Sequence, residues 1–100
     1  MNFEEFRSTL GKPKPPASLT TPLRALWLDA KGDWKGAHDL VDDPNDSVEA
    51  RVHAYLHRKE GDLANARYWY RYAGAKAVTD SLEAEWESLV RELLAEKTPG

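Results

Sequence analysis

Cysteine and isoleucine are both missing from this sequence of 100 residues. Without cysteine the chain has no disulfide, no thiol nucleophile and no thiolate ligand for a metal ion. Valine is scarce as well, with five valines against 12 leucines and 13 alanines. Because alanine and leucine favour helices and β-branched residues favour strands, this balance predicts an all-α fold.

Long apolar runs and an excess of one charge are also absent. No stretch approaches the roughly 20 apolar residues that cross a bilayer, and the acidic start at residues 1–5 does not resemble a signal peptide. Lysine and arginine total 14, aspartate and glutamate total 17, and the net charge is −3. We therefore expect a cytoplasmic protein without membrane or nucleic-acid partners.

Prolines separate a short N-terminal arm from the rest of the chain. Near the N-terminus, large apolar residues have helical spacing: Phe3, Phe6 and Leu10. Three prolines then keep residues 11–18 out of a helix. We expect residues 1–18 to form a loosely attached arm with a proline-rich connector, either folded back or disordered. Residues 19–97 are expected to form a single helical-repeat domain, since 100 residues leave room for one core.

Capping residues and glycine stops divide that domain into five predicted helices. The expected ranges are Thr21 to the stop at Gly32, Asp33 to Asp42, Asp46 to Gly61, Asp62 to Ala73, and Asp80 to Glu96. The expected N-caps include Thr21, Asp46 and Asp80, and Glu49 and Glu83 complete capping boxes with the last two. This order predicts two antiparallel helical hairpins followed by a C-terminal capping helix.

Two segments of the chain, residues 25–37 and 54–66, repeat one another 29 residues apart. They share an early alanine (Ala25, Ala54), a Gly-Asp turn (Gly32-Asp33, Gly61-Asp62) and a later alanine (Ala37, Ala66). Glycine adopts the left-handed geometry that ends one helix, aspartate caps the next, and alanine lets the two axes approach closely. The repeat therefore predicts one hairpin from each segment.

This pattern resembles the tetratricopeptide repeat. The residues that carry the resemblance are Gly61, Asp62, Leu63, Ala66, Tyr70 and Ala73, with Gly32, Asp33, Trp34, Ala37 and Val41 matching the first half of the signature. It covers about residues 22–74, although the spacing of 29 is shorter than the ~34 of the family, and Thr21 and Ala50 occupy the positions of its first-helix tryptophan. The resemblance implies stacked hairpins whose first helices line a peptide-binding groove.

A second resemblance covers the run HAYLHRKEGD, residues 53–62, together with the aromatic residues at 68–70. These segments are similar to a small uncharacterised family, which implies no activity.

His53, His57 and Glu60 lie at positions i, i+4 and i+7 of one predicted helix and therefore share a face. Two imidazoles one turn apart chelate Zn²⁺ or Fe²⁺, and a carboxylate one turn later would complete the ligand set. The other interpretation is that both histidines pack against a neighbouring helix and hydrogen-bond buried groups. A metal- or His-dependent enzyme centred on these three residues is therefore the alternative function. The leading hypothesis has no catalytic residue, metal or cofactor.

Basic residues on the same predicted helix, with one tyrosine, form a second candidate site: Arg51, Tyr55, Arg58 and Lys59. Arg51, Tyr55 and Arg58 have the spacing that faces the groove of a tetratricopeptide fold, and arginine binds carboxylates in bidentate geometry. The predicted ligand is a protein or peptide with an acidic segment or a C-terminal carboxylate. The alternative is that these charges form an ordinary solvated helix face.

Aromatic residues surround the next predicted helix, at Tyr68, Trp69, Tyr70 and Tyr72. One helix buries a single stripe, so Tyr68 or Tyr72 must meet the last helix, the N-terminal arm or an external partner. A second copy of the chain is one such partner, because two hairpins fall short of the ~3 repeats that usually bury a continuous core. The sequence thus predicts a non-enzymatic protein-interaction module of tetratricopeptide type, with a homodimer as one expected assembly.

Overall fold

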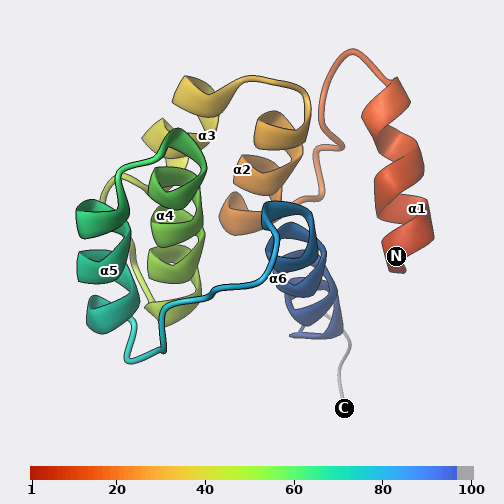
Figure 1. The fold of residues 1–100 in the computed structure, drawn as a ribbon. Coiled ribbons are helices and arrows are strands. Elements are labelled where there is room, and N and C mark those ends of the chain that lie inside the picture. Colours follow the sequence, from red (N-terminus) through yellow and green to blue (C-terminus); the bar gives the residue numbers. More distant parts are fainter. Residues whose placement is uncertain (97–100) are drawn as a thin grey trace.

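Helices account for most of residues 1–96, which the computed structural model describes (Figure 1). They are α1 (Phe3–Ser8), the 3-10 turn η1 (Thr9–Gly11), α2 (Thr21–Ala30), α3 (Trp34–Val41), α4 (Ser47–Glu60), α5 (Leu63–Tyr72) and α6 (Leu82–Glu96). No strand occurs within this range, so the predicted all-α class is confirmed. The predicted domain end at residue 97 lies outside it.

The two Gly-Asp turns form helical hairpins, as the repeat predicts. Gly32 and Gly61 have φ angles of 87° and 90°, in the left-handed region that glycine adopts without strain. The next aspartate in each turn caps the following helix: Asp33 accepts from the N–H of Gly36, and Asp62 accepts from the N–H of Asn65. The first turn reverses the chain between α2 and α3, and the second reverses it between α4 and α5.

Two of the predicted N-caps are wrong by one residue. Thr20 is the N-cap of α2, because Thr21 already belongs to the helix. Ser81 precedes α6 and its hydroxyl accepts from the N–H of Ala84, whereas the carbonyl of Asp80 accepts from Arg58.

The start of α4 confirms its N-cap but changes its predicted capping box. Asp46 accepts from the N–H of Glu49 at 2.8 Å. The Glu49 carboxylate accepts from the N–H of Asn45 at 3.2 Å, one residue before the N-cap. The box is therefore not the reciprocal pair that the spacing predicts.

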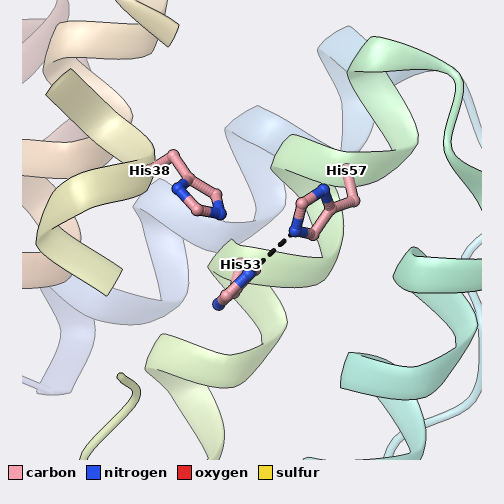
Figure 2. A group of neighbouring side chains, drawn as sticks. All are labelled: His38, His53 and His57. Carbon is pink, nitrogen blue, oxygen red and sulfur yellow. Dashed lines mark hydrogen bonds between the residues drawn. The ribbon is translucent and has the colours of Figure 1, made fainter. Parts of the chain in front are cut away.

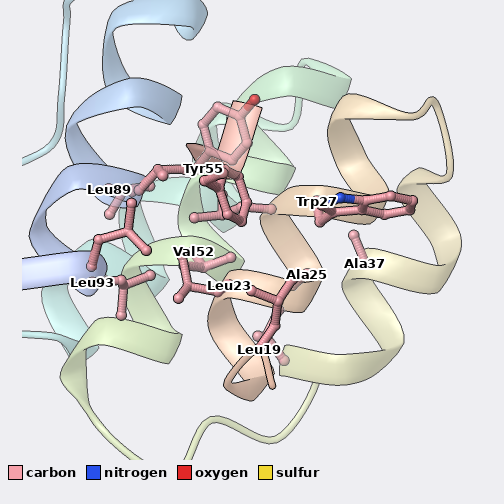
Figure 3. Packing of buried hydrophobic residues seen from close by; sticks show 14 of the residues in the cluster. Leu19, Leu23, Ala25, Trp27, Ala37, Val52, Tyr55, Leu89 and Leu93 are labelled. Carbon is pink, nitrogen blue, oxygen red and sulfur yellow. The ribbon is translucent and has the colours of Figure 1, made fainter. Parts of the chain in front are cut away.

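Apolar side chains of α2, α4 and α6 interlock in one core (Figure 3). Leu23 of α2, Val52 and Leu56 of α4, and Leu89 and Val90 of α6 are at most 1% exposed. Ala37 and Ala66 are buried in the corresponding places of the two hairpins, as the repeat predicts. The burial of α6 shows that this helix forms part of the core.

The N-terminal arm folds back and packs against α6, so it is not loosely attached. Phe3 and Phe6 are buried, and their ring centroids lie 5.9 and 6.0 Å from that of Trp86. The indole of Trp27 donates a hydrogen bond to the Thr9 hydroxyl at 3.0 Å. The arm lies at the edge of the molecule opposite α5 (Figure 1). Within residues 1–96, no helix is long and apolar enough to cross a membrane.

Candidate functional site

Three histidine side chains converge between α3 and α4 (Figure 2). His53 and His57 project from α4 and are 2% and 6% exposed, and His38 approaches from α3 and is half-buried. The Nε2 atoms of His53 and His57 are 2.9 Å apart. One ring nitrogen from each of the three histidines lies within 4.8 Å of the other two.

The outer nitrogens of the two α4 histidines have fixed partners. Nδ1 of His53 is 2.8 Å from the carbonyl oxygen of Val41, and Nδ1 of His57 is 2.7 Å from a carboxylate oxygen of Glu60. A carbonyl and a carboxylate only accept, so both Nδ1 atoms must carry the proton. In a neutral imidazole the other nitrogen is then an acceptor. The hydrogen bond between the two Nε2 atoms therefore requires a proton shared between two lone pairs (Figure 2).

Aromatic rings cover the histidine cluster from two sides. The indole of Trp34 stacks on His38 with centroids 4.9 Å apart, and the indole of Trp69 stacks on His53 at 4.2 Å. Burial, and to a smaller extent the neighbouring histidines, lower the pKa of His53 to about 4, against the opposing effect of its hydrogen bond to Val41. His53 is therefore a neutral imidazole at pH 7.

Glu60, predicted as the third metal ligand, lies behind His57 and contacts its Nδ1 atom. The residues predicted from the spacing therefore do not surround one point: the two Nε2 atoms face each other, and His38 takes the place expected for the carboxylate. A signal for His38 is present in the sequence, because Trp34, Ala37, His38 and Val41 have the i, i+3, i+4, i+7 spacing of a packed helix face.

The predicted anion clamp is engaged in contacts within the chain. Arg51 contacts Glu92 at 2.6 Å, and Arg58 contacts Glu85 at 2.7 Å, so α6 neutralises both guanidinium groups. Tyr55 is buried and donates to a carboxylate oxygen of α2 at 2.8 Å. The exposed and unpaired arrangement that a clamp requires is therefore not observed for these three residues.

Tyr68 and Tyr72 are exposed on the outer face of α5, with 54% and 60% of their surface accessible. Both rings meet Trp69 edge-on, at centroid distances of 5.0 and 5.3 Å. The N-terminal arm lies at the opposite edge of the molecule and does not cover them (Figure 1). Binding through these tyrosines stays a prediction.

A groove of about 450 Å³ lies between α1, α2, α4 and α6, and we call it the central groove. Its apolar lining consists of Phe3, Leu10, Ala30, Leu82 and Trp86; its polar lining consists of Arg7, Asp29, Tyr55, Lys59, Glu83 and Glu87. Asp29 is buried and accepts hydrogen bonds from Tyr55 at 2.8 Å and from the Lys59 ammonium at 2.9 Å. Lys59 belongs to the basic constellation that the spacing in α4 singles out, whereas Asp29 is not predicted as a site residue from the sequence.

No protein-family model matches the sequence, and comparisons with curated proteins and with solved structures find no match either.

Proposed function

We propose that this protein is a non-enzymatic, peptide-binding module of tetratricopeptide type and that its ligand binds in the central groove. The observation that carries this proposal is a groove of about 450 Å³ with an apolar lining and a lysine ammonium beside it. Its volume and mixed lining are those of a typical ligand site. The first helices of both hairpins, α2 and α4, contribute to it, as the resemblance to tetratricopeptide repeats implies.

The lining of the groove indicates what the ligand offers. Phe3, Leu82 and Trp86 supply apolar surface for one large side chain of a peptide. An ammonium has three N–H donors, and Lys59 directs one of them at Asp29. The side chain of Lys59 is 39% exposed, which leaves its other donors for a carboxylate of the ligand. We therefore propose a peptide that pairs an apolar side chain with a nearby or C-terminal carboxylate.

The alternative of a His-dependent enzyme receives less support from this geometry. None of His38, His53 and His57 lines the central groove, so a ligand held there does not meet an imidazole. A general base must lie within hydrogen-bond reach of the group that it deprotonates. We therefore assign the groove to binding alone.

The proposal can be tested by screening the full chain against a display library of peptides whose C-termini are free and randomised. Ala30 is exposed and lines the groove, so Ala30→Trp should fill the groove without disturbing the core. Lys59→Met keeps the aliphatic stem and removes the charge. Both variants should weaken a selected peptide by at least about 10-fold, which corresponds to 1.4 kcal/mol. Ala64→Trp, at an exposed alanine of α5, is the matched control and should leave binding unchanged.

Two results would contradict the proposal. The first is a library that yields no peptide. The second is a selected peptide that is insensitive to Ala30→Trp but is lost in the double variant Tyr68→Ser and Tyr72→Ser, which would place binding on the outer face of α5.

A further inference from the structure

We propose that His38, His53 and His57 form a binding site for a divalent transition-metal ion, with Zn²⁺ the best match. The site lies between the two hairpins and is separate from the central groove, which none of the three residues lines. It also differs from the site that the spacing in α4 predicts, because its third ligand comes from α3.

The facing lone pairs of His53 and His57 are the first argument. Two acceptor nitrogens 2.9 Å apart repel each other unless a cation lies between them. A single shared proton meets this need in the metal-free protein. A metal ion meets it equally well and releases that proton to solvent, as metal binding to imidazole generally does.

The groups behind the histidines are the second argument. Metal-ligating histidines usually donate their other ring N–H to a carbonyl or a carboxylate, which fixes the ring and its tautomer. Val41 supplies a carbonyl to His53, and Glu60 supplies a carboxylate to His57. Both Nε2 atoms are therefore oriented as ligands before any metal binds. The indole of Trp69 stacks on His53 and limits the motion of its ring.

His38 approaches the two α4 histidines from the facing helix, at a distance that suits a third ligand. Zn–N bonds of about 2.0–2.1 Å place neighbouring nitrogens of a tetrahedral site about 3.3 Å apart. The two Nε2 atoms of α4 are 2.9 Å apart, slightly closer than in a tetrahedral site. The ring nitrogen of His38 lies within 4.8 Å of the other two ligand nitrogens, and this upper limit exceeds the tetrahedral spacing. Ring shifts on the order of 1 Å therefore complete the triangle. The half-buried His38 has the space for such a shift, because 20% of its side chain is exposed.

The donor set identifies the class of metal. Three imidazoles favour Zn²⁺, Cu²⁺, Ni²⁺ and Fe²⁺ over Mg²⁺ and Ca²⁺, which prefer oxygen ligands. Three protein ligands leave a fourth tetrahedral position for water. Because His38 belongs to one hairpin and the other ligands to the next, a bound ion would link α3 to α4 and stabilise their packing.

The experiment uses the full chain without a polyhistidine tag and titrates it with ZnCl₂ by calorimetry and with CoCl₂ by visible absorption. We expect one ion per chain, a raised Tm, and the d–d absorption of tetrahedral Co²⁺. His38→Gln should weaken Zn²⁺ binding by at least about 10-fold. Because His38 is only half-buried, this substitution should leave the helix content unchanged, as measured by circular dichroism.

Two further variants test whether Glu60 positions His57 and whether the metal ion binds at the end of α4 instead. Glu60→Gln should weaken Zn²⁺ binding by about 10–100-fold, and ¹⁵N NMR of the metal-free protein should show a changed tautomer population for His57. Asp62→Asn is the matched control, because Asp62, Glu60 and His57 could form a competing site at the end of α4. An asparagine retains the N-cap of α5, and binding should not change.

Three outcomes would overturn the proposal. One is no Zn²⁺ binding at concentrations up to about 1 mM, the weak end of useful affinity. Another is Zn²⁺ binding that persists unchanged in His38→Gln. The third is binding that Asp62→Asn abolishes, which would assign the metal to the end of α4.

Discussion

Glu85 accepts two of the polar contacts that attach α6 to the second hairpin, and its substitution should be costly. The side chain is 4% exposed, accepts from the Arg58 guanidinium at 2.7 Å and accepts from the Tyr70 hydroxyl at 2.5 Å. Glu85→Gln preserves the shape of the side chain and removes its charge. It also leaves the guanidinium of Arg58, itself 14% exposed, without a carboxylate partner.

The expected magnitude follows from comparison with a second ion pair on the same helix. Glu87 and Arg91 are also 2.7 Å apart, but their side chains are 46% and 57% exposed. Exposed pairs contribute about 0–1 kcal/mol because water screens them. Breaking a buried pair by removing one partner costs about 3–5 kcal/mol, since the remaining charge is left in a medium of low dielectric. At equal ion-pair distance, the burial of Glu85 and its additional hydrogen bond from Tyr70 should make the Glu85 variant the less stable of the two.

Urea denaturation at pH 7, followed by far-UV circular dichroism, measures the difference. Glu85→Gln should lower the free energy of unfolding by about 3 kcal/mol, and Glu87→Gln by less than about 1 kcal/mol. Equal m-values would show that both variants unfold from the same native state. Equal losses of stability in the two variants would refute the assignment of Glu85 as a buried attachment point.

Three further predictions concern packing, backbone conformation and pH. Ala66→Leu should cost about 1–3 kcal/mol in urea unfolding, because it overpacks a buried helix contact; no loss would contradict the hairpin packing. Gly61→Ala should cost about 1–2 kcal/mol, all of it from the φ of 90°, since the added methyl group meets nothing within 4 Å. Burial raises the pKa of both Tyr55 and Tyr70, and their carboxylate partners raise it further. Unfolded tyrosine ionises near pH 10, so the stability that these two tyrosines contribute is fully present below about pH 10 and is lost as the pH rises further. In alkaline urea unfolding, a Tyr70→Phe variant that loses stability as steeply as the unmodified protein would contradict this prediction.

Deletion of residues 1–16 tests the role of the N-terminal arm, and light scattering on the intact and the shortened chain tests the expected homodimer. The deletion uncovers an apolar surface of α6 that Phe3 and Phe6 bury, so the Tm should fall and light scattering should show dimers of the shortened chain. A monomer with an unchanged Tm would mean that the arm is dispensable.

Local signals in the sequence predict the hairpins because they act over a few residues. A left-handed glycine and a capping aspartate end one helix and begin the next without help from the rest of the chain. The turns at Gly32 and Gly61 are accordingly where the sequence places them. The N-caps of α2 and α6 are shifted by one residue, because Thr20 and Ser81 are capping residues next to the predicted ones.

The histidine cluster shows the limit of this reasoning. The spacing of His53 and His57 places both on one face, but which neighbour faces them depends on how two hairpins stack. Packing between α3 and α4 brings His38 to this face. Glu60 is the last residue of α4, and its carboxylate contacts the outer nitrogen of His57. No local rule separates the two sides of an imidazole.

The engagement of the basic residues of α4 follows from the position of α6. This helix packs on the apolar face that α2 and α4 share. Its carboxylates thereby meet Arg51 and Arg58. Lys59 lies one residue further on, near the C-terminal end of α4, and pairs with α2 instead. The central groove therefore lies where α2 and α4 end and α6 begins. In our proposal, peptide binding is confined to this end of the three helices.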